Sequence, residues 1–298
     1  MGPDPILQRL PMIGQVIVNG ILLGGIYALV SLGLTLIFGV MRIINFAHGQ
    51  FLMLAMYATF WLFQLYGVDP YVSILIVVPL MFVIGLVAYR MIIQPIIDAS
   101  EMTHVFATLG LNLSLQGIAL FFWQGDFRGI RTGYSSMVFH LGPLYINVPR
   151  FIIFLCAIAT ILVLSLFLKK TYTGKAIRAS AQKRVAAQLM GVNLSKIYMI
   201  AFGIGIAIVG VTGAVLMPIY EVFPSVGSLF ALVAFVVVVL GGLGNLGGAL
   251  VGGIIIGVVE SVSGVFIAPA LKEGVYFIIF VIILLLRPTG IFGKAVIH

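Results

Sequence analysis

Runs of about 20 apolar residues recur along this chain, and they restrict its fold more than any other feature. A helix of that length crosses the hydrocarbon core of a bilayer. The last run is short, and the two before it can also be read as one broken or re-entrant element. The sequence therefore predicts an all-α integral membrane protein, a polytopic helical bundle with eight or nine transmembrane spans. The windows are 13–38, 46–66, 71–93, 103–123, 149–168, 197–219, 226–243, 245–268 and 274–287.

Composition supports this class. Of the 298 residues, 62% are apolar and 8% are charged, whereas about 25% of the residues of soluble domains are charged. Such a chain cannot cover itself with polar surface. The first window lacks a small-residue cleavage site, so we expect it to be retained as a span. The lone Cys156 lies in an apolar run and is expected to be a core residue. Nothing indicates a soluble domain or a long linker, so residues 1–298 are expected to form a single domain.

The segment 169–196 fixes the expected orientation. It carries seven basic residues and no acidic one, and short loops rich in Lys and Arg remain in the cytoplasm. By alternation, 124–148 is external, whereas Arg42, the link 94–102 and the tail 287–298 are cytoplasmic. With nine spans the N-terminus is external. Orientation thus explains much of the net charge of +8 better than nucleic-acid binding does. One observation runs against the rule that basic residues remain in the cytoplasm. Three arginines lie in or near the segment expected outside: Arg128, Arg131 and Arg150.

The middle of this basic segment is expected to be helical, because residues 175–190 contain no Pro or Gly and are rich in Ala. Ile177, Ala181, Val185 and Leu189 recur at four-residue steps and predict one stripe. A positively charged cytoplasmic helix with a small-residue face suits docking of a soluble partner. An ordinary solvated loop is the alternative.

Two segments, 36–54 and 238–256, each join apolar helices through a short break on the same predicted side of the membrane. Discontinuous helices are places where transporters expose backbone groups. A tight interhelical turn explains both breaks equally well, so both interpretations stay open.

The glycines near the second break match the dinucleotide fingerprint GxGxxG at 242–247, but the wholly apolar run that follows rules out a nucleotide site. Small residues four apart instead let transmembrane helices approach closely. The residues expected at such helix contacts are Gly20, Gly24, Gly244, Gly248, Gly252, Gly253 and Gly257.

Motifs of catalysis are missing from the sequence. It has no P-loop, no HExxH and no GxSxG, and its four histidines are scattered. We therefore expect no catalytic residue, no metal site and no cofactor bound by this chain.

Polar residues within or beside the spans are candidates for a substrate path. Glu260 is the clearest, because a charge in a span is costly and often functional; a paired packing group near a helix end is the alternative. For the others, an interhelical hydrogen bond is the competing role. So few charges also argue against an ion-channel ring or a proton relay. The candidates are Asn19, Tyr27, Asn45, His48, Asn112, Gln116 and Glu260.

Four segments resemble the membrane permease of branched-chain amino acid ABC importers: 24–51, 173–193, 238–261 and 287–293. The match runs in order over nearly the whole chain, and INFAHG and GGLGNLGGALVGG are its distinctive blocks. It is closer to the shorter permease of the high-affinity leucine/isoleucine/valine type. The resemblance implies a multi-pass protein of a bacterial or archaeal inner membrane, with a cytoplasmic C-terminus. The implied partners are a second permease (homologue or copy), two cytoplasmic ATPase subunits that use ATP-Mg, an external substrate-binding protein and membrane lipid, but no nucleic acid.

The resemblance also implies that 169–196 is a cytoplasmic coupling loop within a single importer permease domain, although 173–181 lacks the acidic residue of the general importer pattern. The expected cargo is a small neutral or zwitterionic solute, foremost a branched-chain amino acid. Alternatives are a permease for urea, short amides or small carboxylates, an ion-coupled secondary transporter, for which only Glu260 would qualify, and a structural or assembly protein. The residues expected to couple to the ATPase are Gly174, Lys175, Arg178, Ala181, Gln182, Ala187 and Gly191.

Overall fold

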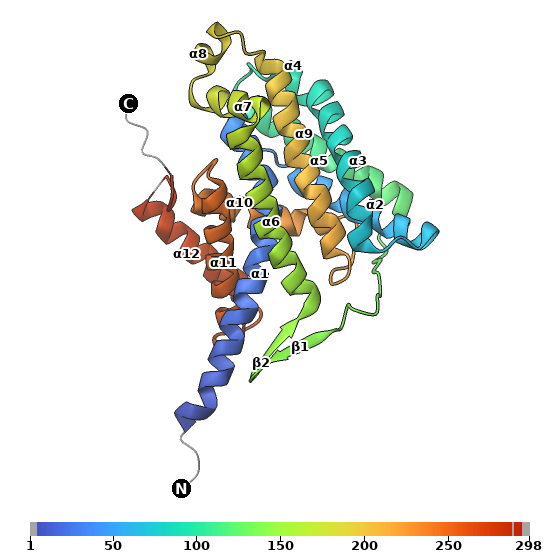
Figure 1. Ribbon diagram of the computed structural model, residues 1–298, viewed down its shortest axis with the longest axis vertical. Coiled ribbons are helices and arrows are strands. Elements are labelled where there is room, and N and C mark those ends of the chain that lie inside the picture. The colour runs from blue at the N-terminus through green and yellow to red at the C-terminus, as the bar shows by residue number, and fades with distance from the viewer. Residues whose placement is uncertain (1–4, 288, 294–298) are drawn as a thin grey trace.

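The computed structural model describes residues 5–287 and 289–293, in which the chain forms an elongated helical bundle (Figure 1). Lys294, part of the expected cytoplasmic tail, lies outside the described residues. In the described part, nine long helices follow the predicted windows in order. They are α1 (Pro5–Met41), α2 (His48–Tyr66), α3 (Pro70–Ala88), α5 (Glu101–Trp123), α6 (Val148–Lys170), α9 (Leu194–Leu216), α10 (Val226–Gly241), α11 (Leu246–Phe266) and α12 (Lys272–Leu286).

Not all of these helices are long and apolar enough to cross a bilayer alone. Within the described residues six segments meet that criterion, and α10 and α12 have only 16 and 15 residues. The all-α membrane class is thus confirmed in outline, but the count of eight or nine spans is not. The six segments are Met12–Met41, Pro70–Ile96, Glu101–Trp123, Val148–Lys170, Leu194–Leu216 and Leu246–Phe266.

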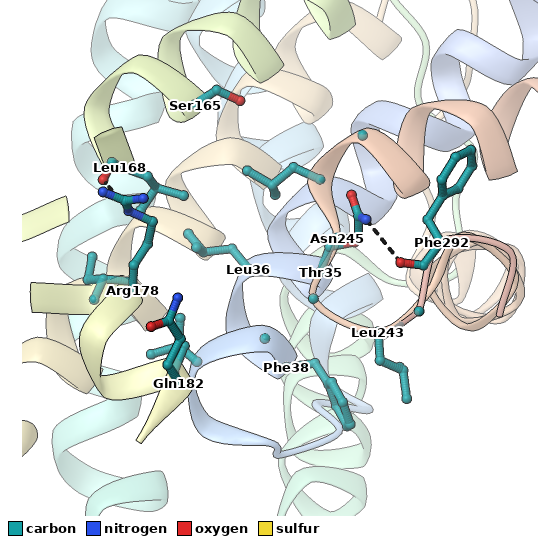
Figure 2. A pocket seen from close by; sticks show the side chains of 18 of the residues that line it. Thr35, Leu36, Phe38, Ser165, Leu168, Arg178, Gln182, Leu243, Asn245 and Phe292 are labelled. Carbon is teal, nitrogen blue, oxygen red and sulfur yellow. Dashed lines mark hydrogen bonds between the residues drawn. The ribbon is translucent and has the colours of Figure 1, made fainter. Parts of the chain in front are cut away.

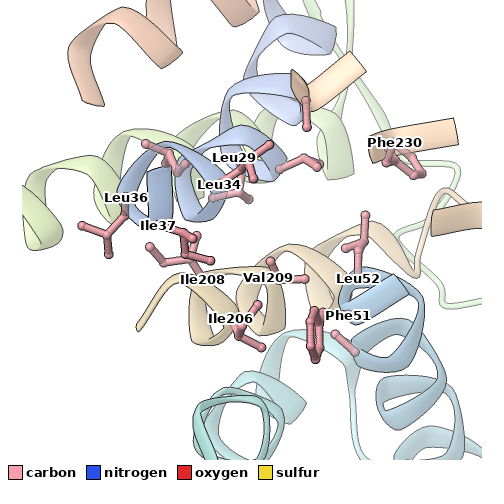
Figure 3. Close-up of a cluster of buried hydrophobic side chains, with 14 of the residues drawn as sticks. Leu29, Leu34, Leu36, Ile37, Phe51, Leu52, Ile206, Ile208, Val209 and Phe230 are labelled. Atoms are coloured by element: carbon pink, nitrogen blue, oxygen red, sulfur yellow. The ribbon is translucent and has the colours of Figure 1, made fainter. Parts of the chain in front are cut away.

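Helix α1 is the central element, and 83% of its most apolar window is buried. It packs along α11, where Gly20 and Gly24 lie against Gly257 and Gly253 with only backbone between them. Because these glycines carry no side chains, the axes of α1 and α11 lie close together. The close approach increases the dispersion contact between the two helices. On another side, apolar side chains of α1, α2, α9 and α10 form the buried core, which includes Leu29, Ile37, Phe51, Leu52, Ile206, Val209 and Phe230 (Figure 3).

Two small features depart from a plain helical bundle. Helix α3 continues through a π-helical turn, η1 (Tyr89–Ile93), into α4 (Gln94–Ile96). The segment 124–148 contains an antiparallel hairpin, β1 (Val138–Leu141) and β2 (Leu144–Asn147), which the all-α prediction did not include. This hairpin lies at the end of the molecule opposite α7 (Tyr172–Gln182) and α8 (Arg184–Leu189) (Figure 1).

The helical prediction for 175–190 is confirmed, except that one residue divides the segment into two helices. Lys183 adopts an extended conformation (φ −145°, ψ 96°) and separates α7 from α8. The predicted stripe therefore does not form: Ile177 is buried, whereas Val185 and Leu189 are 67% and 83% exposed. The break lets Arg184 reach Asp98 on the neighbouring link at 2.7 Å. A tertiary contact of this kind readily overrides helix propensity.

The break between α10 and α11 is a tight interhelical turn. Gly242 and Gly244 have φ of 95° and 83°, a region that favours glycine. The side chain of Asn245 then caps α11 by accepting a hydrogen bond from the Gly248 N–H at 3.0 Å. Gly244 packs on Gly39 near the end of α1, so this turn lies beside the point where the α1–α2 break begins.

The break between α1 and α2 is instead a discontinuity inside the bundle. His48, the first residue of α2, bonds through Nε2 to the carbonyl oxygen of Val30 at 3.0 Å. Val30 precedes the last residue of α1 by eleven positions, which is about 16 Å along a helix. The link 42–47 must therefore run back into the bundle before α2 begins. A six-residue extended segment, roughly 20 Å long, covers that distance.

Candidate functional site

Helix α7 is attached closely to the end of α6. A single residue, Thr171, separates the two helices, and its hydroxyl accepts a hydrogen bond from the Gly174 N–H at 3.0 Å. Gly174 packs on the backbone of Leu168, where any side chain would clash. Arg178 Nε donates to the carbonyl oxygen of the same Leu168 at 2.8 Å. A displacement of α7 is thus transmitted directly to α6.

The residues expected at the coupling surface divide into two groups. Gly174 and Ala187 are buried and Ala181 is half-buried, so these three pack inside the segment. Four others are exposed: Lys175, Arg178, Gln182 and Gly191. Gly191 has φ of 82° and an open surrounding, so the conformation of the turn after α8, and not a close contact, requires glycine there.

Four large apolar side chains are exposed on α7 and around α8, at this tip of the molecule, and the sequence analysis had singled out only Val185 and Leu189 among them. Leu189 and Met190 are 83% and 84% exposed, Val185 is 67% exposed, and Tyr172 on α7 is 84% exposed. Their signal in the sequence was the occurrence of large apolar residues in an otherwise polar loop. Large exposed apolar side chains in a segment rich in Lys and Arg are typical of a surface that binds a protein partner.

An ion pair connects α8 to the link before α5. The Arg184 guanidinium donates to the Asp98 carboxylate at 2.7 Å and lies 5.9 Å from the centre of the Tyr198 ring. The hydrogen bond to Asp98 raises the pKa of Arg184, so this cation keeps its charge at every physiological pH. Both partners are largely exposed, so the ion pair orients α8 more than it stabilises the fold.

Next to α7 lies a cavity of about 660 Å³ (Figure 2). Its walls come from the ends of α1 and α6, from α7, from the α10–α11 turn and from Phe292 and Gly293. Asn245 Nδ2 donates to the Phe292 carbonyl at 3.2 Å and fixes the final described segment against the turn. Arg42, Lys169 and Arg178 line this cavity and no acidic residue does. We call this positively charged cavity, at the same end of the molecule as α7 and α8, the vestibule.

The glycines expected at helix contacts occupy two seams. Gly20, Gly24, Gly253 and Gly257 lie between α1 and α11. In the second seam Gly244 faces Gly39, while Gly248 and Gly252 face Gly241 at the end of α10. All seven have neighbouring backbone within the space that a side chain would need. Of the second seam, Gly39 and Gly244 line the vestibule.

Glu260 and Tyr27 meet, but in a cluster that neutralises the carboxylate. Tyr27 donates its hydroxyl hydrogen to Glu260 Oε2 at 2.5 Å, and Lys272 Nζ donates to Oε1 at 2.8 Å. Lys272, at the start of α12, is a partner that the sequence analysis missed. The three side chains join α1, α11 and α12. Such a saturated carboxylate fits a structural junction better than a group that binds a passing solute.

Asn45, His48 and Asn112 converge on a second cavity, of about 200 Å³. Asn45 and His48 come from the link and the start of α2, and Asn112 from α5. Asn45 Nδ2, His48 Nδ1 and Asn112 Oδ1 are buried and have no hydrogen-bond partner. Buried polar atoms are nearly always paired, so three unpaired atoms around one cavity indicate a place for a polar ligand.

The remaining two candidates lie apart from this cavity. Asn19 accepts a hydrogen bond from Gln15 Nε2 at 3.1 Å, and Gln15 also bonds to Tyr145 of the hairpin. Gln116 lies one turn beyond Asn112 on α5 and is half-buried. Neither lines the cavity that holds Asn112. In the described part of the chain no three His, Cys, Asp or Glu residues are grouped as metal ligands.

Comparison with known proteins identifies relatives along the whole bundle. The family described as "Branched-chain amino acid transport system / permease component" matches residues 16–284. The chain is 30% identical to the high-affinity branched-chain amino acid transport system permease protein LivH of Salmonella typhimurium, over 94% of this chain and 95% of that protein. It is also 30% identical to BraD, the permease protein of the same description in Pseudomonas aeruginosa, with the same coverage.

More distant similarity extends to other permeases. A probable branched-chain amino acid transport permease protein of Methanocaldococcus jannaschii is 30% identical over 94% of this chain and 92% of its own length. The ribose import permease protein RbsC of Bacillus subtilis is 26% identical over 56% of this chain and 53% of its own length. No solved structure matches the chain significantly.

Proposed function

Because this chain belongs to the family of permease components of branched-chain amino acid transport systems, we propose that it is the membrane subunit of an ATP-driven importer for leucine, isoleucine and valine. The family match across 16–284 is the observation that carries this proposal. The relatives named for branched-chain amino acids cover at least nine-tenths of the chain, whereas the ribose permease covers about half. The whole chain then acts as one permease domain.

The importer would contain a second permease, two cytoplasmic ATPase subunits that hold ATP-Mg, and an external substrate-binding protein. Energy enters through the partners, and this chain supplies the path through the lipid. The exposed apolar side chains of α7 and α8, in the same segment as the exposed Lys175, Arg178 and Lys183, support the assignment of 169–196 as the ATPase-coupling loop. A groove on a soluble partner would bury these apolar side chains.

The same assignment orients the chain in a bacterial or archaeal inner membrane. With α7 and α8 in the cytoplasm, the hairpin is external and the segment ending at Gly293 is cytoplasmic. The chain then crosses the membrane nine times. In this arrangement the link 42–47 completes the crossing that α2 makes, and the segment 217–225 completes the crossing that α10 makes. Helices that begin inside the bilayer are shorter or less apolar than full spans, which accounts for α2 and α10 among the three described helices that miss the simple criterion; α12 is the third.

Coupling would run from the tip to the vestibule. ATP-driven closure of the partner subunits pushes α7, and α7 moves α6 through Thr171, Gly174 and the Arg178 bond. Since α6 and α7 form part of the vestibule wall, the vestibule opens or closes with the nucleotide state. The ion-coupled alternative has little support, because Glu260 is already paired with Lys272.

Uptake measurements test the proposal. Vesicles that contain the full complex and external binding protein should accumulate radiolabelled leucine, isoleucine and valine when ATP is supplied to the ATPase side. An ion gradient alone should drive none. If the same vesicles transport urea or a dicarboxylate and ignore leucine, the ATP-driven permease stands and the substrate assignment fails.

A further inference from the structure

The starts of α2 and α10 meet inside the membrane. The backbones of Gly49 and Gly227, each the second residue of its helix, are in contact, and Gln50 Nε2 donates to Ser228 Oγ at 3.3 Å. From this point α10 runs to Gly241 beside the vestibule, and α2 runs the other way, toward the end that holds the hairpin. The bond from His48 to Val30 places the junction about 16 Å along α1 from its last residue, well inside the bundle.

Both helix starts lack a side-chain cap. No side chain accepts a hydrogen bond from the first turn of α2 or of α10, whereas Asp69, Asn193 and Asn245 cap α3, α9 and α11. Main-chain carbonyls accept from part of each first turn: the His48 and Gln50 N–H groups donate to Asn45 and Ala47, and the Val226 and Ser228 N–H groups donate to Phe223 and Ser225. The partial positive charge of each helix start remains. Inside the bundle water does not replace the cap as it does at a surface. Two such ends at one point favour an anionic group there.

The cavity of about 200 Å³ lies at this junction, and Asn45, His48 and Ser228 line it. Asn45 is 2% exposed and His48 is 1% exposed. The Ala47 N–H donates to Asn45 Oδ1, so the unpaired Nδ2 is a donor. His48 Nε2 faces a carbonyl oxygen and therefore carries the hydrogen, which leaves Nδ1 of the neutral ring as an unpaired acceptor.

Asn112 supplies a second unpaired acceptor through Oδ1. The remaining walls are apolar, and none of the lining residues is Asp, Glu, Lys or Arg. A solute with net charge would find no counter-charge here. The volume is many times the roughly 10–15 Å³ that one water molecule needs, so a molecule of several heavy atoms fits. The apolar wall consists of Leu34, Ile44, Phe46, Ala231, Leu232 and Phe235.

We propose that this cavity is a binding subsite for the zwitterionic end of an aliphatic α-amino acid, a proposal that rests on the import function proposed above. The carboxylate accepts hydrogen bonds from Asn45 Nδ2 and faces the uncapped starts of α2 and α10. The ammonium group donates to His48 Nδ1 and Asn112 Oδ1. The aliphatic side chain lies against the apolar wall. One donor side and two acceptors therefore match the two ends of a zwitterion.

Ligand protection of a cysteine in the cavity wall tests the subsite directly. The variant Leu232→Cys, in a Cys156→Ala background, is labelled with a maleimide in the permease assembled with its ATPase partners but without the binding protein. Leucine should slow labelling several-fold. At the same concentration 4-methylpentanoate, which lacks the ammonium group, and leucinamide, which lacks the carboxylate, should not. Equal protection by all three compounds, or none by leucine, would overturn the subsite.

Variants of the polar atoms provide the second measurement. Asn112→Leu removes one acceptor from a half-buried position, and His48→Gln keeps an N–H donor for the Val30 carbonyl while it removes the ring acceptor. Each should raise the leucine concentration for half-protection by about tenfold or more, as loss of a hydrogen bond to a charged group does. Ser114→Ala, on the exposed side of α5, is the matched control and should change it less than about twofold. Unchanged protection in Asn112→Leu also refutes the subsite, even if His48→Gln fails to fold.

The two proposals fail separately. If wild-type complexes import leucine but leucine gives no protection, the subsite is wrong and the import function stands. If wild-type complexes import no branched-chain amino acid, the import function itself is wrong.

Discussion

The backbone of Gly49 at the start of α2 lies directly against the backbone of Gly227 at the start of α10, with no side chain between them. A Cβ atom on either residue would overlap the carbonyl oxygen of the other. Only glycine at both positions lets two helix ends approach so closely in the middle of the bundle.

Replacing Gly227 with leucine should destabilise this junction. Forcing a side chain into a packed contact costs about 1–3 kcal/mol or more, so the purified complex should melt at a lower temperature and leucine uptake should be lost. Gly117→Leu is the control, because nothing lies within 4 Å of a Cβ at Gly117. Equal melting temperatures for Gly227→Leu and the wild type would contradict the described contact.

The Glu260–Lys272 pair should behave as a structural junction. Glu260 is 7% exposed and Lys272 is 41% exposed, so the carboxylate depends on its partners more than the ammonium group does. Lys272→Met should destabilise the protein more than the double variant Glu260→Gln/Lys272→Met, because it leaves a buried charge unpaired.

A double-mutant cycle followed by thermal unfolding measures this coupling, expected at about 0.5–3 kcal/mol. Leucine uptake by Glu260→Gln should stay near wild type. Additive effects, or uptake lost in Glu260→Gln without loss of stability, would instead place Glu260 on the substrate path.

Substitution of Leu189 with aspartate should uncouple the ATPase. Leu189 is 83% exposed at the tip, so folding should be unaffected, whereas truncation of a central interface side chain weakens binding by about tenfold or more. The measurement is co-purification of the ATPase subunits together with substrate-stimulated ATP hydrolysis. Tyr66→Asp is the control, an equally drastic change at a 75% exposed residue of the opposite end. Normal ATPase association in Leu189→Asp would indicate a plain solvated loop.

Bulky residues in the same loop provide a related test. Ala181 is half-buried beside the vestibule, so Ala181→Trp should lower transport while it leaves membrane insertion intact. Gly191 is less informative, because its φ of 82° makes any side chain strained whether or not a partner docks there. Normal transport in Ala181→Trp would remove the argument for close packing.

Cysteine labelling tests the orientation. A cysteine at Gln182 should react only from the cytoplasm and one at Gly133 only from outside, because both positions are exposed and lie at opposite ends of the bundle. Lys294→Cys should follow Gln182. Labelling of the Gln182 position from outside would reverse the assignment of every loop.

The sequence predicted the helices well because each depends on a local run of apolar residues. All nine windows correspond to helices, and most boundaries agree within a few residues. The break at Lys183 could not be predicted from local residues, since the contact that accompanies it joins Arg184 to Asp98, 86 positions away. The hairpin 138–147 was also not predicted. The sequence analysis assigned the segment 124–148 a side of the membrane but no secondary structure.

The candidate site was predictable only as a set of unusual residues. Polar side chains in apolar runs drew attention to Asn45, His48 and Asn112, but nothing local placed them around one cavity. The same criterion selected Glu260, and only the fold brings Lys272 to it. Likewise, the sequence left both breaks open, and the depth of His48 beside Val30 distinguishes the discontinuity from the tight turn.

Helix α10 is synthesised long after α2, and this order has a consequence for the insertion of the protein into the membrane. The residues that cover the start of α2 are made long after it: Gln50 and Ser228 are 178 positions apart. Until α10 has been synthesised, Gln50 at the start of α2 lacks its partner Ser228, and Gly49 lacks the backbone of Gly227. A chain truncated before Val226 should therefore be recognised by membrane proteases as unfinished, even though its first six long helices are complete.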